Sequence, residues 1–356
     1  METSGGQEGR ASRAFAGDHV AMRTVDLHNH MVTEEVVSFL VEEGRHLSTR
    51  VVEGPNGRVA EIGEGSVRPL GARMCDPVSR IADMDRLGIT TQAVSATPFL
   101  LYADAPPDIA LAVAQVSNDS LAAVARRHPH RFAPLASVPL QDPERAAAEL
   151  ERAVGLGLHG VEIPPSTTDL TLDDPRLEPF WAAAEDRRLP LCIHPFEASP
   201  RGAFARYLLS PLVGNLYDTG LAATLLVLGG VLERHPLLEV VLYHGGGTFA
   251  ALLARLDKGH ELFDACRARA PRRPSEYVRQ FSFDTITFDS RWLRHLIERF
   301  GADRLVLGSD YPLPLGPPDP VGEVQALALP ADDERRILGG NACRLLHIED
   351  SRGAQP

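Results

Sequence analysis

The chain has 356 residues, of which 44% are hydrophobic and 24% are charged, a composition that predicts a globular protein with a large core. Its 36 Lys and Arg residues against 48 Asp and Glu residues give a net charge of −12, which argues against nucleic acid or an anionic membrane as the main partner. No apolar run reaches the roughly 20 residues needed to span a bilayer. The cysteines are widely spaced without a C-x-x-C motif, which is typical of a reduced, cytoplasmic protein: Cys75, Cys192, Cys266 and Cys343.

The N-terminal part begins with residues 1–22, which are mainly Gly, Ser, Ala and charged residues without periodicity. We expect a disordered tail that lacks the apolar core of a secretory signal. The first strand is expected over residues 24–30 and ends in His28 and His30. Side chains two residues apart on a strand share a face, so both imidazoles would project together as a pair of metal ligands. An isolated His-x-His is weak evidence, because a polar strand end has the same pattern.

An insertion follows this strand. A polar helix is expected over residues 34–43, and residues 44–75 are rich in glycine with short β-like pieces at 49–52 and 58–62. We expect residues 31–75 to form a small sheet or lid that interrupts the first βα unit.

A regular alternation of strands and helices begins after residue 75. Further strands are expected at 89–96, 132–138, 160–163, 189–194, 238–243, 281–284 and 304–308, with helices at 77–87, 107–127, 142–155, 174–187, 217–234, 248–263, 290–299 and 332–346. Strict alternation requires a parallel sheet with right-handed crossovers. Eight strands favour a (β/α)₈ TIM barrel over residues 23–347, with C-terminal helices and a short tail at 348–356. A doubly wound open sheet is the alternative, but no G-x-G-x-x-G follows the first strand.

Polar residues stand at the carboxyl ends of several predicted strands, where the active site of such a barrel lies. Besides the His-x-His pair, strand five ends in His194, strand six in His244 and strand eight in Asp310. One of these alone would be unremarkable, because a single strand-end histidine is more often a satisfied core residue. Five at one rim indicate a metal site.

Together with this set, five motifs resemble the amidohydrolase superfamily, and within it the branch of 2-amino-3-carboxymuconate-6-semialdehyde decarboxylase and related carboxy-lyases. The motifs are His244-Gly-Gly-Gly-Thr-Phe249, Gly308-Ser-Asp-Tyr-Pro-Leu-Pro-Leu-Gly316, Pro274-Ser-Glu-Tyr-Val278, Val138-Pro-Leu-Gln-Asp142 and Ile337-Leu-Gly-Gly-Asn341. The resemblance spans nearly the whole chain, and the run through Asp310 is its most specific part. It implies a cytoplasmic, metal-dependent, non-oxidative decarboxylase of an unsaturated or aromatic carboxylic acid.

The resemblance also implies a ligand set and an acid/base. His28, His30, His194 and Asp310 would bind one metal ion, with Zn²⁺ expected and Mn²⁺ also compatible. His244 would be the acid/base, and Asp310 would also be catalytic. Two-metal members of the superfamily add a carboxylate or lysine on strand four, where this chain has Glu162. We expect Glu162 to be structural or solvent-facing, and therefore expect one metal.

Three further residues are assigned through the resemblance to substrate binding. Arg68 matches an arginine that holds a substrate carboxylate, and Arg255 matches an arginine that reaches the neighbouring site in a homodimer. Phe196 stands where the named decarboxylase has Trp, which keeps an apolar wall but loses an N–H donor. The alternatives are a metal-dependent hydrolase or hydratase of the same superfamily, and a binding protein that has kept the barrel without the chemistry.

Overall fold

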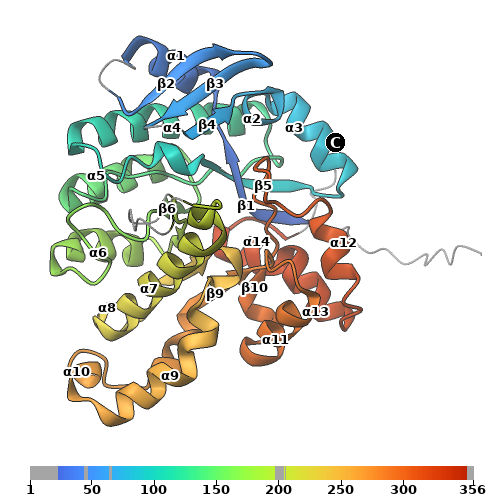
Figure 1. Ribbon diagram of the computed structural model, residues 1–356. Helices are drawn as coiled ribbons and strands as arrows, with labels where there is room; N and C mark the ends of the chain where they lie inside the picture. Colours follow the sequence, from blue (N-terminus) through green and yellow to red (C-terminus); the bar gives the residue numbers. More distant parts are fainter. Residues whose placement is uncertain (1–22, 44–46, 64–65, 197–203, 205, 351–356) are drawn as a thin grey trace, which may run out of the picture.

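The computed structural model describes residues 23–43, 47–63, 66–196, 204 and 206–350, and its central feature is a ring of parallel strands (Figure 1). The predicted tail over residues 1–22 lies outside these residues. The barrel strands are β1 (Val25–Met31), β5 (Thr91–Ala96), β6 (Val161–Ile163), β7 (Pro190–Ile193), β8 (Glu239–Leu242), β9 (Phe281–Asp284) and β10 (Leu305–Val306). All pairings among them are parallel, with β1 beside β5 and the order β10-β9-β8-β7-β6 in the larger sheet. The predicted TIM barrel is confirmed, because backbone hydrogen bonds join these two sheets at both edges.

The first seam lies between β5 and β6, where the predicted strand 132–138 is wrong as a regular strand. This segment is extended and buried, but it pairs only at isolated bridges from Phe132 to Gln92 and from Ala136 to Val161. Pro134 interrupts it, and proline has no N–H to donate to a sheet. The segment nevertheless occupies the place of the missing strand between β5 and β6.

The second seam joins the last strand to the first. The Leu27 amide donates to the carbonyl of Leu307 at 2.8 Å, and the His30 amide donates to the carbonyl of Tyr311 at 2.8 Å. Beyond the two-residue strand β10, the chain thus continues alongside β1. These bonds close the ring and bring the segment after β10 against the His-x-His strand.

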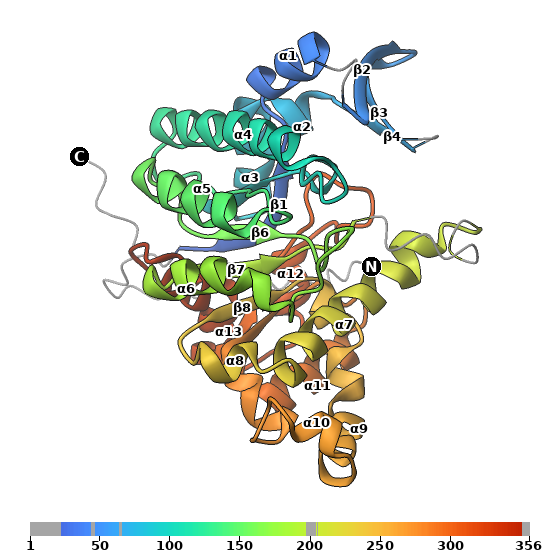
Figure 2. The same ribbon diagram turned by 90° about the vertical axis from the view of Figure 1, so that its left-hand side faces the viewer.

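Helices cover the outside of the ring (Figures 1 and 2). They are α3 (Pro77–Arg86), α4 (Pro107–Arg127), α5 (Pro143–Gly155), α6 (Glu178–Asp186), α7 (Asn215–Leu228), α8 (Val231–Arg234), α9 (Phe249–Leu262), α10 (Asp264–Arg267), α11 (Ser290–Phe300), α12 (Pro320–Gln325), α13 (Ala331–Arg335) and α14 (Asn341–Leu346). As predicted, Asp142 caps α5 by accepting from the Arg145 amide, with Pro143 in the first turn. The predicted helix 217–234 instead divides into α7 and α8, because Gly230 turns left-handed with φ 75°.

Short 3₁₀ and π turns extend several of these helices. They are η1 (Pro98–Leu100), η2 (Pro175–Leu177), η3 (Ser210–Gly214), η4 (His244–Gly246), η5 (Pro274–Gln280), η6 (Ala302–Arg304) and η7 (Arg336–Gly340). The combined segment Ser210–Leu228 is apolar enough to cross a membrane by length and composition alone, with a mean hydropathy of 1.3. In the fold, α7 places Ala223 and Leu226 in the main core between strands and helices, so it serves as a barrel helix.

The insertion after β1 forms the small sheet expected from the sequence. It contains α1 (Glu34–Glu43), an antiparallel sheet of β2 (Thr49–Gly54), β3 (Gly57–Ile62) and β4 (Ser66–Pro69), and the short α2 (Ala72–Cys75). Its apolar face forms a second core with α4, at one end of the barrel (Figure 2). Phe196 and Leu313 pack against this second core. They follow His194 and Asp310 by two and three residues, so the insertion lies beside the strand ends that carry the predicted ligands.

Candidate metal centre

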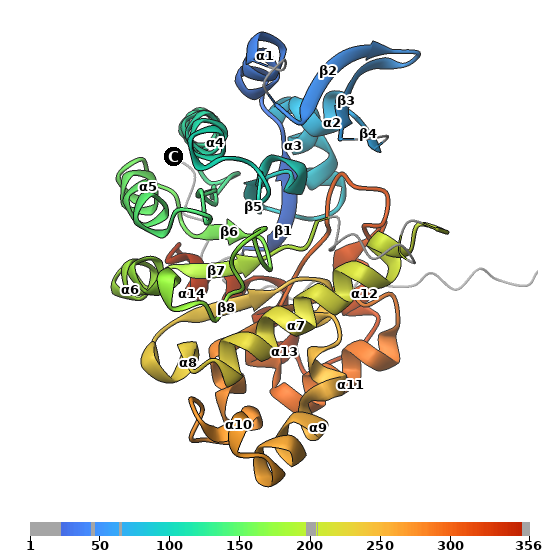
Figure 3. The same cartoon turned by 60° about the vertical axis from the view of Figure 1, so that its left-hand side comes forward.

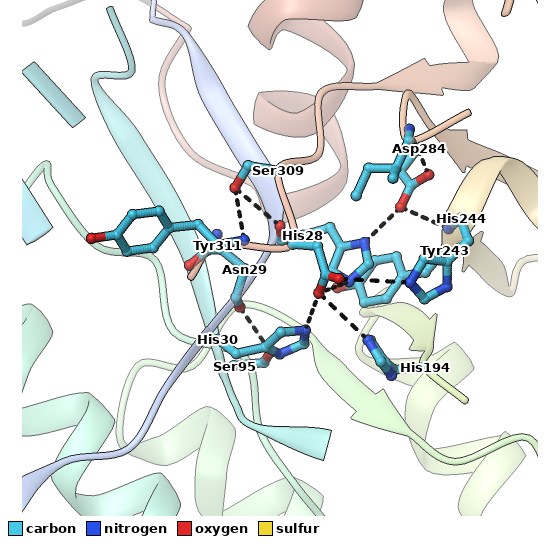
Figure 4. A network of polar contacts seen from close by, with 12 residues as sticks. His28, Asn29, His30, Ser95, His194, Tyr243, His244, Asp284, Ser309 and Tyr311 are labelled. Atoms are coloured by element: carbon cyan, nitrogen blue, oxygen red, sulfur yellow. Dashed lines mark hydrogen bonds and ion pairs between the residues drawn. The ribbon is translucent and has the colours of Figure 1, made fainter. Parts of the chain in front are cut away.

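Four of the predicted residues converge in a buried cluster at the carboxyl ends of the strands (Figure 4). His28 and His30 lie on β1, His194 directly follows β7, and Asp310 follows β10. One ligand atom from each residue lies within 4.8 Å of each of the others. The Nε2 atoms of His28 and His30 are 3.3 and 3.1 Å from Asp310 Oδ1, and that of His194 is 3.9 Å away.

The donor atoms of this cluster fit a divalent metal ion. Each of the Nε2 atoms and Asp310 Oδ1 is buried without a hydrogen-bond partner among the residues that the structure describes. Buried polar atoms left unpaired are rare, and four that point to one place indicate a missing common partner. Three imidazole nitrogens and one carboxylate oxygen are a donor set that Zn²⁺ or Mn²⁺ accepts.

The other ring nitrogen of each of these histidines is hydrogen-bonded, which fixes the tautomer. His28 Nδ1 donates to Asp284 Oδ2 at 2.6 Å, and His194 Nδ1 donates to the carbonyl of Pro195 at 2.7 Å. His30 Nδ1 lies 3.0 Å from Ser95 Oγ and 3.3 Å from the carbonyl of Ala96. With the proton on Nδ1, each Nε2 presents a lone pair to the cluster.

Burial and the Asp310 carboxylate set the charges. Burial lowers the pKa of His30 to about 4 and that of His194 to about 3, so both rings are neutral at pH 7, as metal ligands must be. Burial also lowers the pKa of His28, but its bond to Asp284 and the proximity of Asp310 outweigh this and raise the pKa to about 10. Without metal, this ring is therefore protonated at pH 7, and a bound metal ion would take the place of its Nε2 proton. The surrounding histidines hold the pKa of Asp310 well below its usual range despite burial.

His244 stands beside this group without belonging to it. Its Nε2 is 4.0 Å from Asp310 Oδ2, whereas the other three histidines face Oδ1. Its side chain is 14% exposed and is more accessible than any of the four candidate ligands. Its Nδ1 has no partner among the described residues. Burial first, and then the proximity of the titratable rings of His28 and His194, lower the pKa of His244 to about 4.

The turn that carries His244 depends on its glycines. The left-handed turn η4 follows β8, with φ 56° at His244 and 76° at Gly246. A Cβ on Gly246 would lie 2.5 Å from the ring of Phe283, so only glycine fits there. Gly308 permits a second close approach, because a Cβ there would lie 3.0 Å from Asp284 Cβ and 3.1 Å from His28 Cβ.

Asp284 is the residue of this site that sequence reasoning missed. It is fully buried at the end of β9 and accepts hydrogen bonds from His28 and from the backbone of the η4 turn. The strand 281–284 was predicted with this Asp at its end, at the same rim as the other site residues. That position was the signal from which its role in the site could have been predicted.

Glu162 is buried, which excludes the solvent-facing alternative. Its exposure is 0%, and neither of its carboxylate oxygens has a hydrogen-bond partner of acceptable geometry in the described part of the chain. Oε2 lies 3.9 Å from His30 Nδ1, the nitrogen that faces away from the cluster. Burial raises the pKa of Glu162 to about 8. Glu162 is not part of the ligand group.

The three predicted substrate-binding residues lie in different places. Phe196 is partly buried two residues after His194. Arg68 is on β4 of the insertion, where its guanidinium donates to the carbonyl of Val67 at 3.3 Å. Arg255 is exposed on α9. Among the described residues, no carboxylate lies within ion-pair distance of either arginine.

Comparison with known proteins identifies the family. A model of the amidohydrolase family matches residues 25–348. The chain belongs to the amidohydrolase family. Among similar family members, the 2-amino-3-carboxymuconate-6-semialdehyde decarboxylase of Dictyostelium discoideum is 33% identical over 288 residues, which is 80% of each chain.

Solved structures of amidohydrolase-family decarboxylases share the fold. The 5-carboxyvanillate decarboxylase of Sphingomonas paucimobilis superposes with a TM-score of 0.80 at 29% identity, over 92% of this chain and all of the other. A dihydroxybenzoic acid decarboxylase from Polaromonas, solved with bound manganese and an inhibitor, has a TM-score of 0.75 at 25% identity, over 92% and 97% of the two chains. The predicted family, barrel and reaction class, a metal-dependent carboxy-lyase, are confirmed.

Proposed function

We propose that this decarboxylase acts on an unsaturated or aromatic carboxylic acid, with one divalent ion held by His28, His30, His194 and Asp310. The observation that carries the proposal is the pairing of a complete ligand group with a fourth imidazole, His244, which lies 4.0 Å from Asp310 but outside the group. A metal ion bound there supplies Lewis-acid polarisation and offsets negative charge on the substrate.

The chain's own residues then have to deliver one proton to the substrate. When CO₂ leaves, the electron pair of the broken bond stays on carbon, and a proton must reach that carbon. His244 is neutral at pH 7, partly open to solvent and free at Nδ1 among the described residues, so it can take up a proton and deliver it. Asp310 Oδ2 faces His244 and is the second group in reach to share or relay that proton.

The identity of the metal is proposed as Zn²⁺, on the strength of the three imidazole ligands. The Polaromonas relative contains manganese, and the single carboxylate oxygen in this ligand set is compatible with that ion as well. The direct measurement is metal analysis of protein purified without added metal.

Substrate recognition is proposed to combine an apolar wall with two arginines. Phe196 and Leu313 follow two of the metal ligands and pack on the insertion, so they can flank a planar acid. Arg68 lies on the same insertion with its guanidinium free of carboxylates in the described chain, and its planar fork suits a carboxylate. In a protein of net charge −12, such local positive charge is needed to attract an acid.

Arg255 is proposed to serve the neighbouring site of a homodimer. Helices α7 and α9 lie side by side (Figure 3), and the outer face of η3–α7 exposes Leu212, Val213 and Tyr217 to 52%, 46% and 38%. Such an apolar face is typical of a protein interface. Leu252, three residues before Arg255 on α9, is also exposed, so this arginine stands at the edge of an apolar surface that a second copy would cover.

The test is a substrate panel with two readouts. Zn²⁺- or Mn²⁺-loaded protein is incubated with 2-amino-3-carboxymuconate-6-semialdehyde, 2,6-dihydroxybenzoate and 5-carboxyvanillate, and both CO₂ release and product mass are measured. We expect one CO₂ per molecule of product, and a product lighter by one CO₂. A product heavier by one water without CO₂ release would identify a hydratase or hydrolase and refute the proposal.

A further inference from the structure

The buried carboxylate of Asp284 links the metal ligand His28 to the backbone that carries His244. Oδ2 accepts from His28 Nδ1 at 2.6 Å and from the His244 amide at 2.9 Å. Oδ1 accepts from the amides of Gly245 at 2.7 Å and Ile286 at 3.1 Å. Both oxygens are therefore engaged, and the side chain has no exposure to water.

These bonds have separate consequences for the two histidines. The bond to His28 places the proton on Nδ1 and leaves the Nε2 lone pair for the cluster. The bonds to the amides of His244 and Gly245 hold the first turn of η4, where both residues are left-handed with φ 56° and 62°. A non-glycine residue at such a φ needs surroundings that enforce it.

We propose that Asp284 is the positioning residue that sets the orientation of His28 and His244 together. The same carboxylate accepts hydrogen bonds from the His28 ring and from the His244 amide. The direction of the metal ligand and the position of the acid/base are therefore fixed relative to each other. Asp284 is not one of the four residues of the ligand group, and its effect is exerted through the two histidines. The inference rests on the proposed function only for its turnover readout.

The decisive variant is Asp284→Asn. Asparagine has one acceptor oxygen, and its NH₂ group would face N–H donors where the carboxylate accepts them now. We expect metal affinity, measured by competition with a chelator, to fall about 10- to 100-fold. We also expect kcat at saturating metal to stay reduced, by as much as about 10²-fold, since a displaced catalytic group loses efficiency even when the metal is restored.

Asp26→Asn is the matched control. Asp26 is also a fully buried carboxylate close to His28, but it accepts from the His28 backbone amide, from Gln92 and from Ser309, and it bonds to no imidazole. We expect this variant to lose thermal stability while its metal affinity and its kcat at saturating metal stay near wild type. Equal losses of metal affinity and kcat in both variants would overturn the proposal. The losses would then follow from removing any buried carboxylate near His28, and not from the bonds that Asp284 makes. Full recovery of kcat in Asp284→Asn at saturating metal would overturn the link to His244.

A measurement on the unaltered protein covers the case in which Asp284→Asn fails to fold. In Zn²⁺-loaded, uniformly ¹⁵N-labelled protein, NMR should show the His28 proton on Nδ1 and slow solvent exchange of the His244 and Gly245 amides. A bare Nδ1 or rapid exchange of both amides would refute the proposal. If wild type decarboxylates no acid of the panel, the proposed function fails, while metal affinity and NMR still test Asp284.

Discussion

The ring of Tyr243 lies flat against the imidazole of His28, with centroids 3.7 Å apart and planes 7° apart (Figure 4). The Tyr243 hydroxyl also donates to the carbonyl of Leu27 at 3.1 Å. The stack keeps the His28 ring in one plane, so the direction of its Nε2 atom is restricted.

We predict that Tyr243→Phe and Tyr243→Leu differ in metal affinity. Phenylalanine keeps the stack and loses only the hydroxyl bond, whereas leucine removes the ring. Aromatic pairs contribute about 0.5–1.5 kcal/mol beyond burial, so the leucine variant should bind metal roughly 2- to 10-fold more weakly than the phenylalanine variant. Chelator competition measures this, and equal affinities would show that the stack does not orient His28.

Removal of one ligand should abolish tight metal binding. We expect His194→Ala to purify with little metal, while wild type holds one ion per chain by elemental analysis. Since bound metal stabilises the folded state by mass action, about 2.7 kcal/mol at 100 times Kd, added Zn²⁺ should raise the Tm of wild type but not of this variant. A variant with full metal content would contradict the assigned ligand set.

His244→Ala should separate chemistry from metal binding. We expect full metal content together with a loss of about 10²–10⁴-fold in kcat, the usual contribution of a general acid or base. His194→Ala is the comparison, because it should lose both metal and activity. If His244→Ala also lost its metal, His244 would be a ligand and not the acid/base.

Arg68 and Arg255 should act on substrate binding from different chains. Each Ala variant should lose about 1.5–3 kcal/mol of carboxylate binding, which is roughly 10- to 150-fold in kcat/KM. Mixing Arg255→Ala with His244→Ala chains gives a dimer with one complete site if Arg255 acts in the partner's pocket. We therefore expect partial recovery of activity.

The control for this mixing experiment is differently tagged chains, whose co-purification demonstrates subunit exchange. If the subunits exchange but activity does not recover, Arg255 does not act in the partner's site. It then either acts within its own chain or is a solvated surface residue.

His159 should give the stability a pH dependence that has nothing to do with the metal. Its Nδ1 donates to the carbonyl of Leu346 at 3.0 Å, and burial lowers its pKa below the usual 6.5. The unfolded chain therefore binds this proton first as the pH falls, and stability is lost below about pH 6.5. In chelator-treated protein, His159→Asn should flatten the decrease in urea midpoint between about pH 7.5 and 5. If the urea midpoints of wild type and His159→Asn decreased in parallel with falling pH, His159 would not be a source of the pH dependence.

The sequence predicted the barrel because the alternation of buried strands and capped helices is a local property. The prediction of a strand over 132–138 was wrong because an apolar segment need not form a regular ladder of hydrogen bonds. Here Pro134 has no N–H to donate to such a ladder. The break at Gly230 was missed for a related reason, since the apolar periodicity continues past it. Both errors left the order of the ring unchanged.

The candidate ligands were predictable because each of them ends a strand, and strand ends meet at one rim. Asp284 ends a strand too, but its role depends on the partners it meets in three dimensions, His28 and the η4 turn. Glu162 shows the same limit, because nothing in its neighbours along the chain distinguishes a buried carboxylate from an exposed one.

The closure of the ring between β10 and β1 has a consequence for how the protein is made. Asp310 follows His30 by 280 residues, and the backbone bond from His30 to Tyr311 brings them together only when the last strand is in place. A chain still on the ribosome, or one that ends early, carries three of the four ligands at most. Only complete chains can then bind the metal with all four ligands. An interrupted translation product lacks the stabilisation that bound metal gives to the folded state, and it is therefore more susceptible to proteolysis.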